Sequence, residues 1–258
     1  MITYLLYICI GGLAGFISGL LGGGAGLIMI PSILAILAAD GVAPELTMHM
    51  AIGTAMGSCL ILGLTSSFLQ YQRDAIVWPA FNRLLGGILV GTVVGSIIAI
   101  LIPGQQLKWF FGVLVIALGL WMILHKEHSK KWQANLPIYL GGGFTSAVLN
   151  SLVGVATFTV PFLHKCGFDI RNSVGTATPL TFIVSLLGAI VFAFIGWHNP
   201  SLPVGSFGYL YLPIVIPFSI GSAIFAYIGA QMSHRISRTL LKNCYIVLLF
   251  IVGIKMLT

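Results

Sequence analysis

The feature of this sequence that most restricts its fold is a series of apolar segments, none of which contains an aspartate or a glutamate. Segments of about 20 apolar residues have the length of membrane-spanning helices. The chain is 58% hydrophobic and only 7% charged, against roughly 25% charged residues in soluble domains. A soluble fold of 258 residues could not bury this much apolar surface, and the short alternating strands of membrane β-barrels are absent. The sequence therefore predicts an all-α integral membrane protein.

A glycine cluster interrupts the first apolar segment, and the second half of the chain repeats this pattern. Residues 11–31 read GGLAGFISGLLGGGAGLIMIP, and residues 141–161 read GGGFTSAVLNSLVGVATFTVP. Both copies end in a proline, and Gly24 stands in the first copy where Gly154 stands in the second. Each glycine lowers helix propensity by about 1 kcal/mol relative to alanine, so neither segment is expected to form one continuous helix. Short, interrupted apolar segments at matching positions of two halves indicate the binding site of a secondary transporter.

We therefore expect two repeats of the same plan, at 1–125 and 136–258, joined by a polar linker at 126–135. The first repeat is expected to contain a glycine-broken helical hairpin and three transmembrane helices, at 4–38, 48–70, 79–102 and 107–124. The second repeat is expected to contain the same four units, at 136–163, 172–196, 206–231 and 240–257. A Gly-Thr-Ala triplet lies early in the first transmembrane helix of each repeat, at 53–55 and 175–177.

The distribution of basic residues distinguishes two topologies. If each half crosses the membrane four times and the repeats are parallel, the basic loop residues divide five against five between the two sides. If each hairpin is re-entrant and returns to its own side, the two repeats are inverted and all ten basic residues share one side. These ten are Arg73, Arg83, Lys126, Lys130, Lys131, Lys165, Arg171, Arg235, Arg238 and Lys242. The positive-inside rule favours the second topology, with both termini outside and the linker in the cytoplasm, while a tilted hairpin of full depth stays open.

Inverted hairpins that enter from opposite sides would bring their glycine-rich tips together near the middle of the membrane. The helix that begins after each break points free N–H groups and the positive end of its dipole at this place, which suits an anion. The absence of carboxylates from the spans argues against a cation as substrate. The predicted substrate-binding residues are Gly22, Gly23, Gly24, Gly26, Thr54, Asn150, Ser151, Gly154, Thr176 and Thr178. The alternative is that these residues only close tight turns or bond to their own helix.

Three further side chains are candidates for coupling or for the mouth of the pathway. His49 is a group that could titrate near neutral pH, and Lys165 and Arg171 could collect anions at the cytoplasmic side. Anchoring at the membrane interface is the alternative role of these residues. The four cysteines are scattered without a CxxC motif, so we expect no metal site, disulfide or cofactor. No basic–aromatic patch indicates a nucleic acid as partner.

The segment GFISGLLGGGAGLIMIP, its copy that ends at Pro161, and the IGTA and VGTA steps resemble the TauE/SafE-type family of sulfite or organosulfur-anion exporters. The resemblance covers essentially the whole chain. It implies that a small sulfur oxyanion, such as sulfite, thiosulfate or a sulfonate, crosses a bacterial inner membrane, without fixing the direction or a coupling ion. The second tip departs from the first, because Asn150 and Ser151 stand where the first copy has Leu20 and Leu21. We therefore expect the two tips to play unequal roles.

Together these features predict a secondary transporter in which two inverted halves rock around an anion held between the hairpin tips. Its expected partners are the anion and the lipid bilayer, and a homo-oligomer stays open. An anion channel on the same fold is the first alternative. A membrane enzyme or assembly factor is the second, but the spans offer neither a nucleophile–base pair nor a metal cluster, so we predict no catalytic residues.

Overall fold

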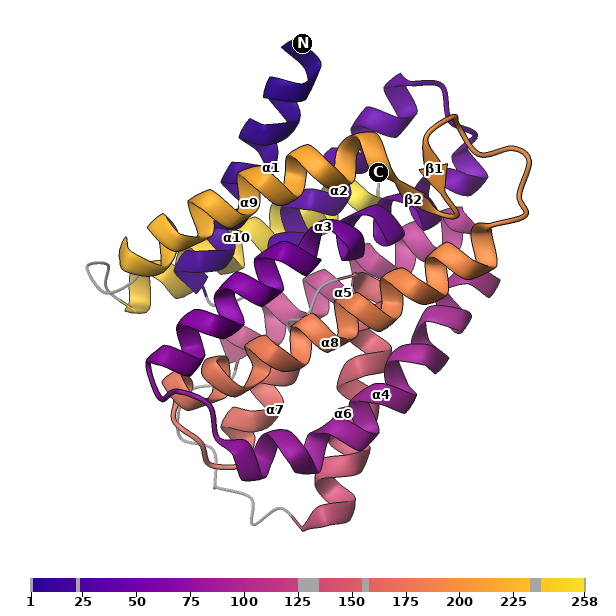
Figure 1. Ribbon diagram of the computed structural model, residues 1–258. Helices are drawn as coiled ribbons and strands as arrows, with labels where there is room; N and C mark the ends of the chain where they lie inside the picture. The colour runs from indigo at the N-terminus through magenta and orange to yellow at the C-terminus, as the bar shows by residue number, and fades with distance from the viewer. Residues whose placement is uncertain (1, 22–23, 125–134, 155–157, 233–237, 258) are drawn as a thin grey trace.

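The computed structural model describes residues 2–21, 24–124, 135–154, 158–232 and 238–257 as helices joined by short loops, with one small β-hairpin (Figure 1). The first half contains α1 (Ile2–Leu21), α2 (Ala25–Ala39), α3 (Pro44–Gln72), α4 (Trp78–Leu101) and α5 (Gly104–Leu124). The second half contains α6 (Leu136–Val153), α7 (Thr159–Lys165), α8 (Ile170–Gly196), β1 (Ser206–Phe207), β2 (Leu210–Tyr211), α9 (Leu212–Met232) and α10 (Arg238–Leu257).

Seven of the described helices, α1, α3, α4, α5, α6, α8 and α9, are long and apolar enough to cross a membrane. Large apolar side chains remain exposed on the helix bundle, for example Leu101 and Phe194, which are 76% and 73% exposed. Such a surface promotes aggregation in water, whereas the hydrocarbon of a bilayer solvates it. The expected all-helical membrane protein is therefore confirmed in its general form, and the chain is a multi-pass membrane protein.

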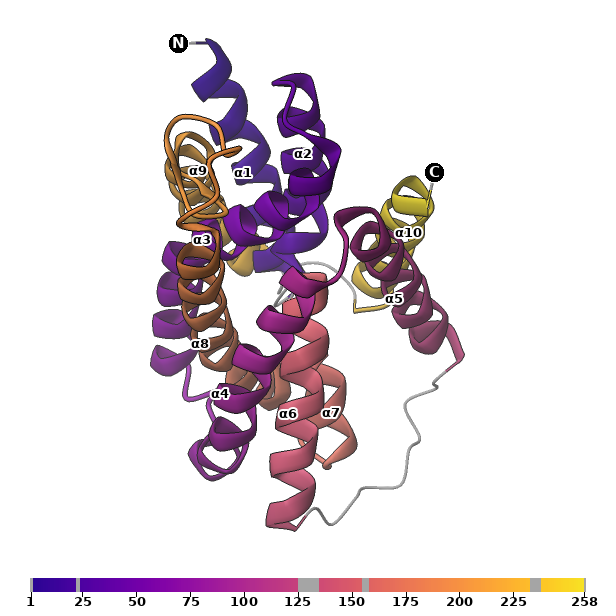
Figure 2. The same ribbon diagram turned by 90° about the vertical axis from the view of Figure 1, so that its right-hand side faces the viewer.

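The main helix contacts join the two halves of the chain to each other. α1 packs along α9, α6 along α4, α3 along α8, and α5 along α10. Figure 2 shows α1 and α2 at one end of the molecule and α6 and α7 at the other, with the ends of α1 and α6 near mid-height. Gly24, which precedes α2, and Gly154, which follows α6, are both buried. The described glycine that borders each interruption therefore lies in the protein interior.

Glycines allow the closest of these helix contacts. A Cβ atom on Gly11 of α1 would lie 2.6 Å from the carbonyl oxygen of Phe218 on α9, and one on Gly95 of α4 would lie 2.7 Å from the Cα atom of Val148 on α6. Both glycines belong to stripes in which a glycine recurs at every fourth position, and such stripes let helix backbones approach each other in lipid. The packing of α1 on α9 and of α4 on α6 thus depends on the absence of a side chain at these positions.

The helix expected at 206–231 begins later than the apolar pattern suggests. Residues 206–211 form the β1–β2 hairpin, in which Ser206 lies opposite Tyr211 and Phe207 opposite Leu210, and α9 starts at Leu212. The backbone N–H of Tyr209, in the turn of this hairpin, donates to the carbonyl oxygen of Phe192 on α8 at 3.3 Å. Gly208 has a positive φ of 57°, which a helix does not accommodate, so the apolar run is interrupted there.

We predict that Gly143→Ala destabilises the protein and that Gly141→Ala on the same helix does not. A Cβ atom on Gly143 would lie 2.7 Å from the carbonyl oxygen of Leu84, whereas one on Gly141 meets nothing within 4 Å. Overpacking of this kind costs about 1–3 kcal/mol. Thermal unfolding of the detergent-solubilised protein checks this, and equal melting temperatures for the two variants would contradict the close packing of α4 on α6.

Candidate functional site

A cavity of about 70 Å³ lies between the interrupted hairpins and the paired helices α3 and α8. Space for one water molecule requires roughly 10–15 Å³, so the cavity can hold a small ion. Residues of both hairpins line it, namely Ser18, Gly19, Gly24, Ala25, Gly26 and Gly154. The structure therefore brings together three of the predicted glycines, Gly24, Gly26 and Gly154. Gly22 and Gly23, also predicted, lie outside the described residues.

The backbone at these tips has the conformation that glycine permits. Gly24, the residue before α2, has φ 95° and ψ 12°, and Gly154, the residue after α6, has φ 60° and ψ 19°. Both are left-handed conformations that L side chains rarely adopt. Gly24, Ala25 and Gly26 line the cavity, so the first N–H groups of α2 and the positive end of its dipole lie beside it. No side chain caps this helix start.

Two polar stripes on α3 and α8 form the walls of the cavity. Ser66 and Gln70 of α3, and Arg73 directly after this helix, lie four and three residues apart, and Thr178, Thr181 and Ser185 have a similar helical spacing on α8. This spacing puts each set on one helix face. The predicted residue Thr178 is thus part of the lining.

The walls contain hydrogen-bond donors that can serve a ligand. Thr178 Oγ1 donates to the Val174 carbonyl oxygen at 2.8 Å, and Thr181 Oγ1 donates to that of Ala177 at 2.9 Å, so these two hydroxyl protons are used within α8. The hydroxyl groups of Ser66 and Ser185 and the side-chain amide of Gln70 make no hydrogen bond within the described part of the chain. Their donors are therefore available to a ligand.

Arg73 is the charged residue of the cavity lining. It follows the last residue of α3, and its carbonyl oxygen accepts a hydrogen bond of 3.0 Å from Nη2 of Arg171, at the start of α8. Within the described residues neither guanidinium forms an ion pair. The predicted mouth residues Arg171 and Lys165 are not part of the lining. Arg171 binds the backbone of Arg73, and the Lys165 ammonium lies 5.5 Å from the ring centre of Trp121.

Thr54 and Thr176, the repeat-paired threonines, lie outside the cavity in equivalent structural roles. Tyr211 N donates to Thr54 Oγ1 at 3.0 Å, and Val77 N donates to Thr176 Oγ1 at 2.9 Å. Tyr211 directly precedes α9, and Val77 directly precedes α4. The threonine of each Gly-Thr-Ala triplet thus accepts a hydrogen bond from the residue directly before a helix of the other half.

Asn150 and Ser151 are buried and also lie outside the cavity lining. Oδ1 of Asn150 accepts from Phe158 N at 3.1 Å, and Nδ2 of Asn150 donates to Thr159 Oγ1 at 3.1 Å, so this side chain bridges the break between α6 and α7. Ser151 Oγ donates to the Thr92 carbonyl oxygen of α4 at 3.4 Å. A part for these two residues and the two threonines in substrate binding stays a prediction.

The polar lining residues that the sequence analysis does not predict include Ser18, Ser66, Gln70, Arg73 and Ser185. The sequence analysis assigns Arg73 to topology alone, as one basic loop residue among ten. The polar positions 66, 70 and 73 share one face of an otherwise apolar helix, and this pattern could have identified Arg73.

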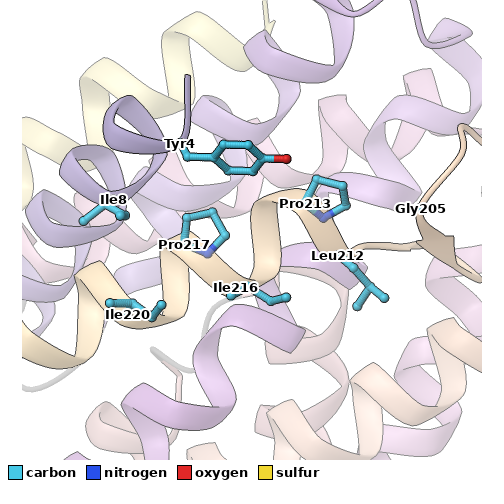
Figure 3. A pocket seen from close by; sticks show the side chains of 8 residues that line it. All are labelled: Tyr4, Ile8, Gly205, Leu212, Pro213, Ile216, Pro217 and Ile220. Carbon is cyan, nitrogen blue, oxygen red and sulfur yellow. The ribbon is translucent and has the colours of Figure 1, made fainter. Parts of the chain in front are cut away.

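A second, larger cavity of about 390 Å³ has a different character (Figure 3). It lies between α1 and α9, and its lining is almost entirely apolar, including Ile8, Leu212, Ile216 and Ile220. Tyr4 and Ile216 in this groove are largely exposed. In a membrane protein such an outward apolar groove faces lipid chains, so the polar cavity between the hairpins is the candidate site. In the described ranges, no three His, Cys, Asp or Glu side chains come close enough to hold a metal ion.

We predict that Thr54→Val and Thr176→Val each destabilise the protein by about 1–3 kcal/mol, because each leaves a backbone N–H without its acceptor. Thr65→Val on α3 is the matched control, since the exposed Thr65 hydroxyl bonds only to its own helix. Unfolding temperatures in detergent measure the effect. A loss in only one of the two threonine variants would argue against their equivalence.

Comparison with known proteins agrees with these structural features. The family model described as "Sulfite exporter TauE/SafE" matches residues 7–256. A "Probable membrane transporter protein" of Haemophilus influenzae is 29% identical over 261 aligned residues, which cover 99% of each chain. The "Probable membrane transporter protein YdhB" of Bacillus subtilis is 23% identical over the full length of both chains, and "Probable membrane transporter protein MJ0441" of Methanocaldococcus jannaschii is 22% identical over 98% of this chain and 94% of its own.

No solved structure matches the chain. The family model covers nearly all of the sequence, including both interrupted hairpins and both Gly-Thr-Ala triplets. This match and the seven apolar helices show that the chain is a multi-pass membrane protein that belongs to the TauE/SafE sulfite exporter family.

Proposed function

We propose that this protein is a secondary transporter that moves a small sulfur oxyanion, such as sulfite, thiosulfate or a sulfonate, across the bacterial inner membrane. The observation that carries the proposal is the cavity between the two hairpins, which is lined by Arg73 and by no acidic residue of the described chain. A cavity with this charge attracts an anion and repels a cation. Membership of a sulfite exporter family supports a sulfur oxyanion in particular.

The anion would bind at the inner part of the cavity, where Gly24, Gly26 and Gly154 meet. Glycine lets a ligand approach the backbone, and the start of a helix offers N–H groups to an anion. Ser66, Gln70 and Ser185 would add side-chain donors, and Arg73 would neutralise the charge. Thr178 would shape the wall, because its own hydroxyl proton bonds to α8.

The other predicted residues would act through the framework of the site. Asn150 bridges the break that ends at α7, and Ser151 holds α6 on α4. Thr54 and Thr176 hold the two long helices against the opposite half. We assign these four residues to positioning the hairpin tips, and Arg171 to positioning Arg73.

We further propose inverted repeats with re-entrant hairpins, and alternating access by rocking of the halves. The pairing of α1 with α9 and of α6 with α4 supports this, since each hairpin packs on a helix of the other half. The cavity follows the second half of α3 and the first half of α8. Toward the start of α3 and the end of α8, Met56 packs on Gly188, and Phe192 packs near Tyr209. Side chains therefore fill the space between the two helices there. An asymmetric cavity is what a transporter in one access state requires.

Arg73→Gln should lower the initial rate of anion uptake about tenfold to a hundredfold, because a charged hydrogen bond contributes roughly 1.5–3 kcal/mol and tenfold corresponds to about 1.4 kcal/mol. Uptake into proteoliposomes of sulfite, thiosulfate, sulfoacetate and sulfate measures it. Arg83→Gln is the matched control, since the exposed Arg83 lies over the Tyr139 ring and not in the cavity.

If the unsubstituted protein binds and moves none of the four anions, the proposed function is wrong. If flux is fast, does not saturate and is independent of any ion gradient, the protein is an anion channel on this fold. Equal losses in the two arginine variants would mean that general surface charge, and not the cavity, determines the rate.

The proposed topology predicts which positions react with a membrane-impermeant maleimide in intact cells. In a variant without the four native cysteines, Asp40→Cys should be labelled from outside and Ser129→Cys only after permeabilisation. Asp40 follows α2, and position 129 lies in the linker between the halves. The reverse labelling would invert the orientation, and labelling of both from one side would contradict the three crossings by α3, α4 and α5 that separate these positions.

A further inference from the structure

The cavity between the hairpins ends where Met56 of α3 packs on Gly188 of α8. Cys59 and Ser185 are the last lining residues toward the start of α3 and the end of α8. Met56 and Gly188 lie three residues further along the same two helix faces. A Cβ atom on Gly188 would overlap Met56 Sδ and lie 3.1 Å from Met56 Cε, so the methionine fills the space over this glycine. Met56 is 2% exposed, and a flexible, unbranched side chain therefore closes this end of the cavity.

The repeat makes this contact the counterpart of two residues that line the cavity. The two Gly-Thr-Ala triplets are 122 residues apart, and the same offset places Thr178 where the first half has Met56. It also places Gly188 where the first half has Ser66. Thr178 and Ser66 both line the cavity. The contact that closes one end therefore corresponds to a pair of residues that is open at the other end.

Backbone hydrogen bonds at the far ends of α3 and α8 follow the same correspondence. Ala75 N donates to the Gln70 carbonyl oxygen at 3.2 Å, and Tyr209 N donates to that of Phe192 at 3.3 Å. Gln70 and Phe192 are again 122 residues apart. Gln70 lines the cavity, whereas Phe192 is fully buried. The two ends thus share a backbone plan, with a polar side chain at the cavity end and an aromatic one at the closed end.

Beyond Met56, aromatic rings fill the closed end. The ring centres of Phe192 and Tyr209 lie 6.3 Å apart, and those of Tyr209 and His49 lie 5.6 Å apart. Nε2 of His49 lies 3.0 Å from the carbonyl oxygen of Ile102, which follows α4. His49, the predicted coupling residue, therefore packs in this end and not in the cavity lining, and its part in coupling stays a prediction.

Ser96 of α4 lies at the closing contact and has no hydrogen-bond partner among the described residues. Its side chain is fully buried, and its Oγ atom would lie 3.6 Å from the same Cβ atom on Gly188. A serine within a span commonly bonds to the carbonyl oxygen four residues earlier. Here that oxygen belongs to Thr92 and accepts a hydrogen bond of 3.4 Å from the hydroxyl of Ser151 on α6. A donor without a described partner is therefore buried next to the Met56 side chain.

We propose that the path of the anion continues from the cavity through the Met56–Gly188 contact, and that Ser96 is a second binding position beyond it. This path rests on the proposed function and gives that transporter a gate, Met56. When the Arg73 end closes in the other access state, the Met56 side chain would leave Gly188. The hydroxyl of Ser96 would then donate a hydrogen bond to an oxygen of the sulfur oxyanion. Such a role accounts for a buried donor that the helix packing leaves unpaired.

The reactivity of Ser96→Cys toward an anionic methanethiosulfonate reagent tests the gate without any transport measurement. In a variant without the four native cysteines, Met56→Ala should raise the rate of this reaction at least about tenfold, because the shorter side chain leaves space over Gly188. Met50→Ala is the matched control, since Met50 is equally buried on another face of α3 and should leave the rate unchanged. Met56→Val takes the place of Met56→Ala if the alanine variant does not fold. Equal rates with and without the Met56 substitution, or an equal rise in Met50→Ala, would overturn the gate.

Ser96→Ala distinguishes a role in anion binding from a role in stability. It should lower the initial rate of anion uptake into proteoliposomes about tenfold, because a hydrogen bond to a charged group is lost. It should leave the unfolding temperature unchanged or raise it, because the Ser96 hydroxyl has no partner to lose among the described residues. Ser222→Ala is the matched control. The buried Ser222 hydroxyl donates to the Ser219 carbonyl oxygen at 3.1 Å, so this variant should unfold at a lower temperature and transport at the unsubstituted rate.

The outcomes separate this inference from the proposed function. Unchanged uptake in Ser96→Ala, or a fall in its unfolding temperature equal to that of Ser222→Ala, would overturn the binding role of Ser96. If the unsubstituted protein moves none of sulfite, thiosulfate, sulfoacetate and sulfate, the proposed function is wrong. The reactivity of Ser96→Cys would then still decide whether Met56 closes a path.

Discussion

The structure depends on satisfying backbone N–H groups where helices are interrupted or begin against buried side chains. Lipid offers no hydrogen-bond partner, so broken backbone within the membrane must be buried in protein and paired. Buried side chains do this in both halves. Asn150 accepts from Phe158 N at the break before α7, Thr54 accepts from Tyr211 N before α9, and Thr176 accepts from Val77 N before α4. The Asn150 bond spans the break between α6 and α7, and the two threonine bonds hold the chain where α9 and α4 begin.

That constraint explains why polar residues in the apolar helices have two different uses. Some, such as Asn150 and Thr176, form hydrogen bonds that hold neighbouring segments together, and they lie away from the cavity. Others, such as Gln70 and Arg73, line the cavity, and their side-chain donors have no hydrogen-bond partner among the described residues. A ligand site can form only where donors remain after the framework is satisfied. The distribution of free donors therefore indicates the site better than the number of polar residues.

The two halves are similar in plan and unequal in chemistry. The repeat aligns His49 of the first half with Arg171 of the second. Nε2 of His49 lies 3.0 Å from the carbonyl oxygen of Ile102, and Nη2 of Arg171 donates to the carbonyl oxygen of Arg73. The cavity likewise follows only one half of α3 and of α8. The two ends of the molecule therefore differ in their side chains and in how closely α3 and α8 pack.

The sequence by itself determined the membrane class, the helical content, the repeated glycine-broken segment and the family, because apolar run length and glycine spacing are properties of the chain alone. It also indicated that Gly24, Gly26 and Gly154 belong together. Periodicity cannot tell which neighbour covers each face of a buried helix. Only the tertiary structure decided that Thr54 faces the strand before α9, that Arg73 faces the cavity, and that both nitrogens of His49 meet carbonyl oxygens.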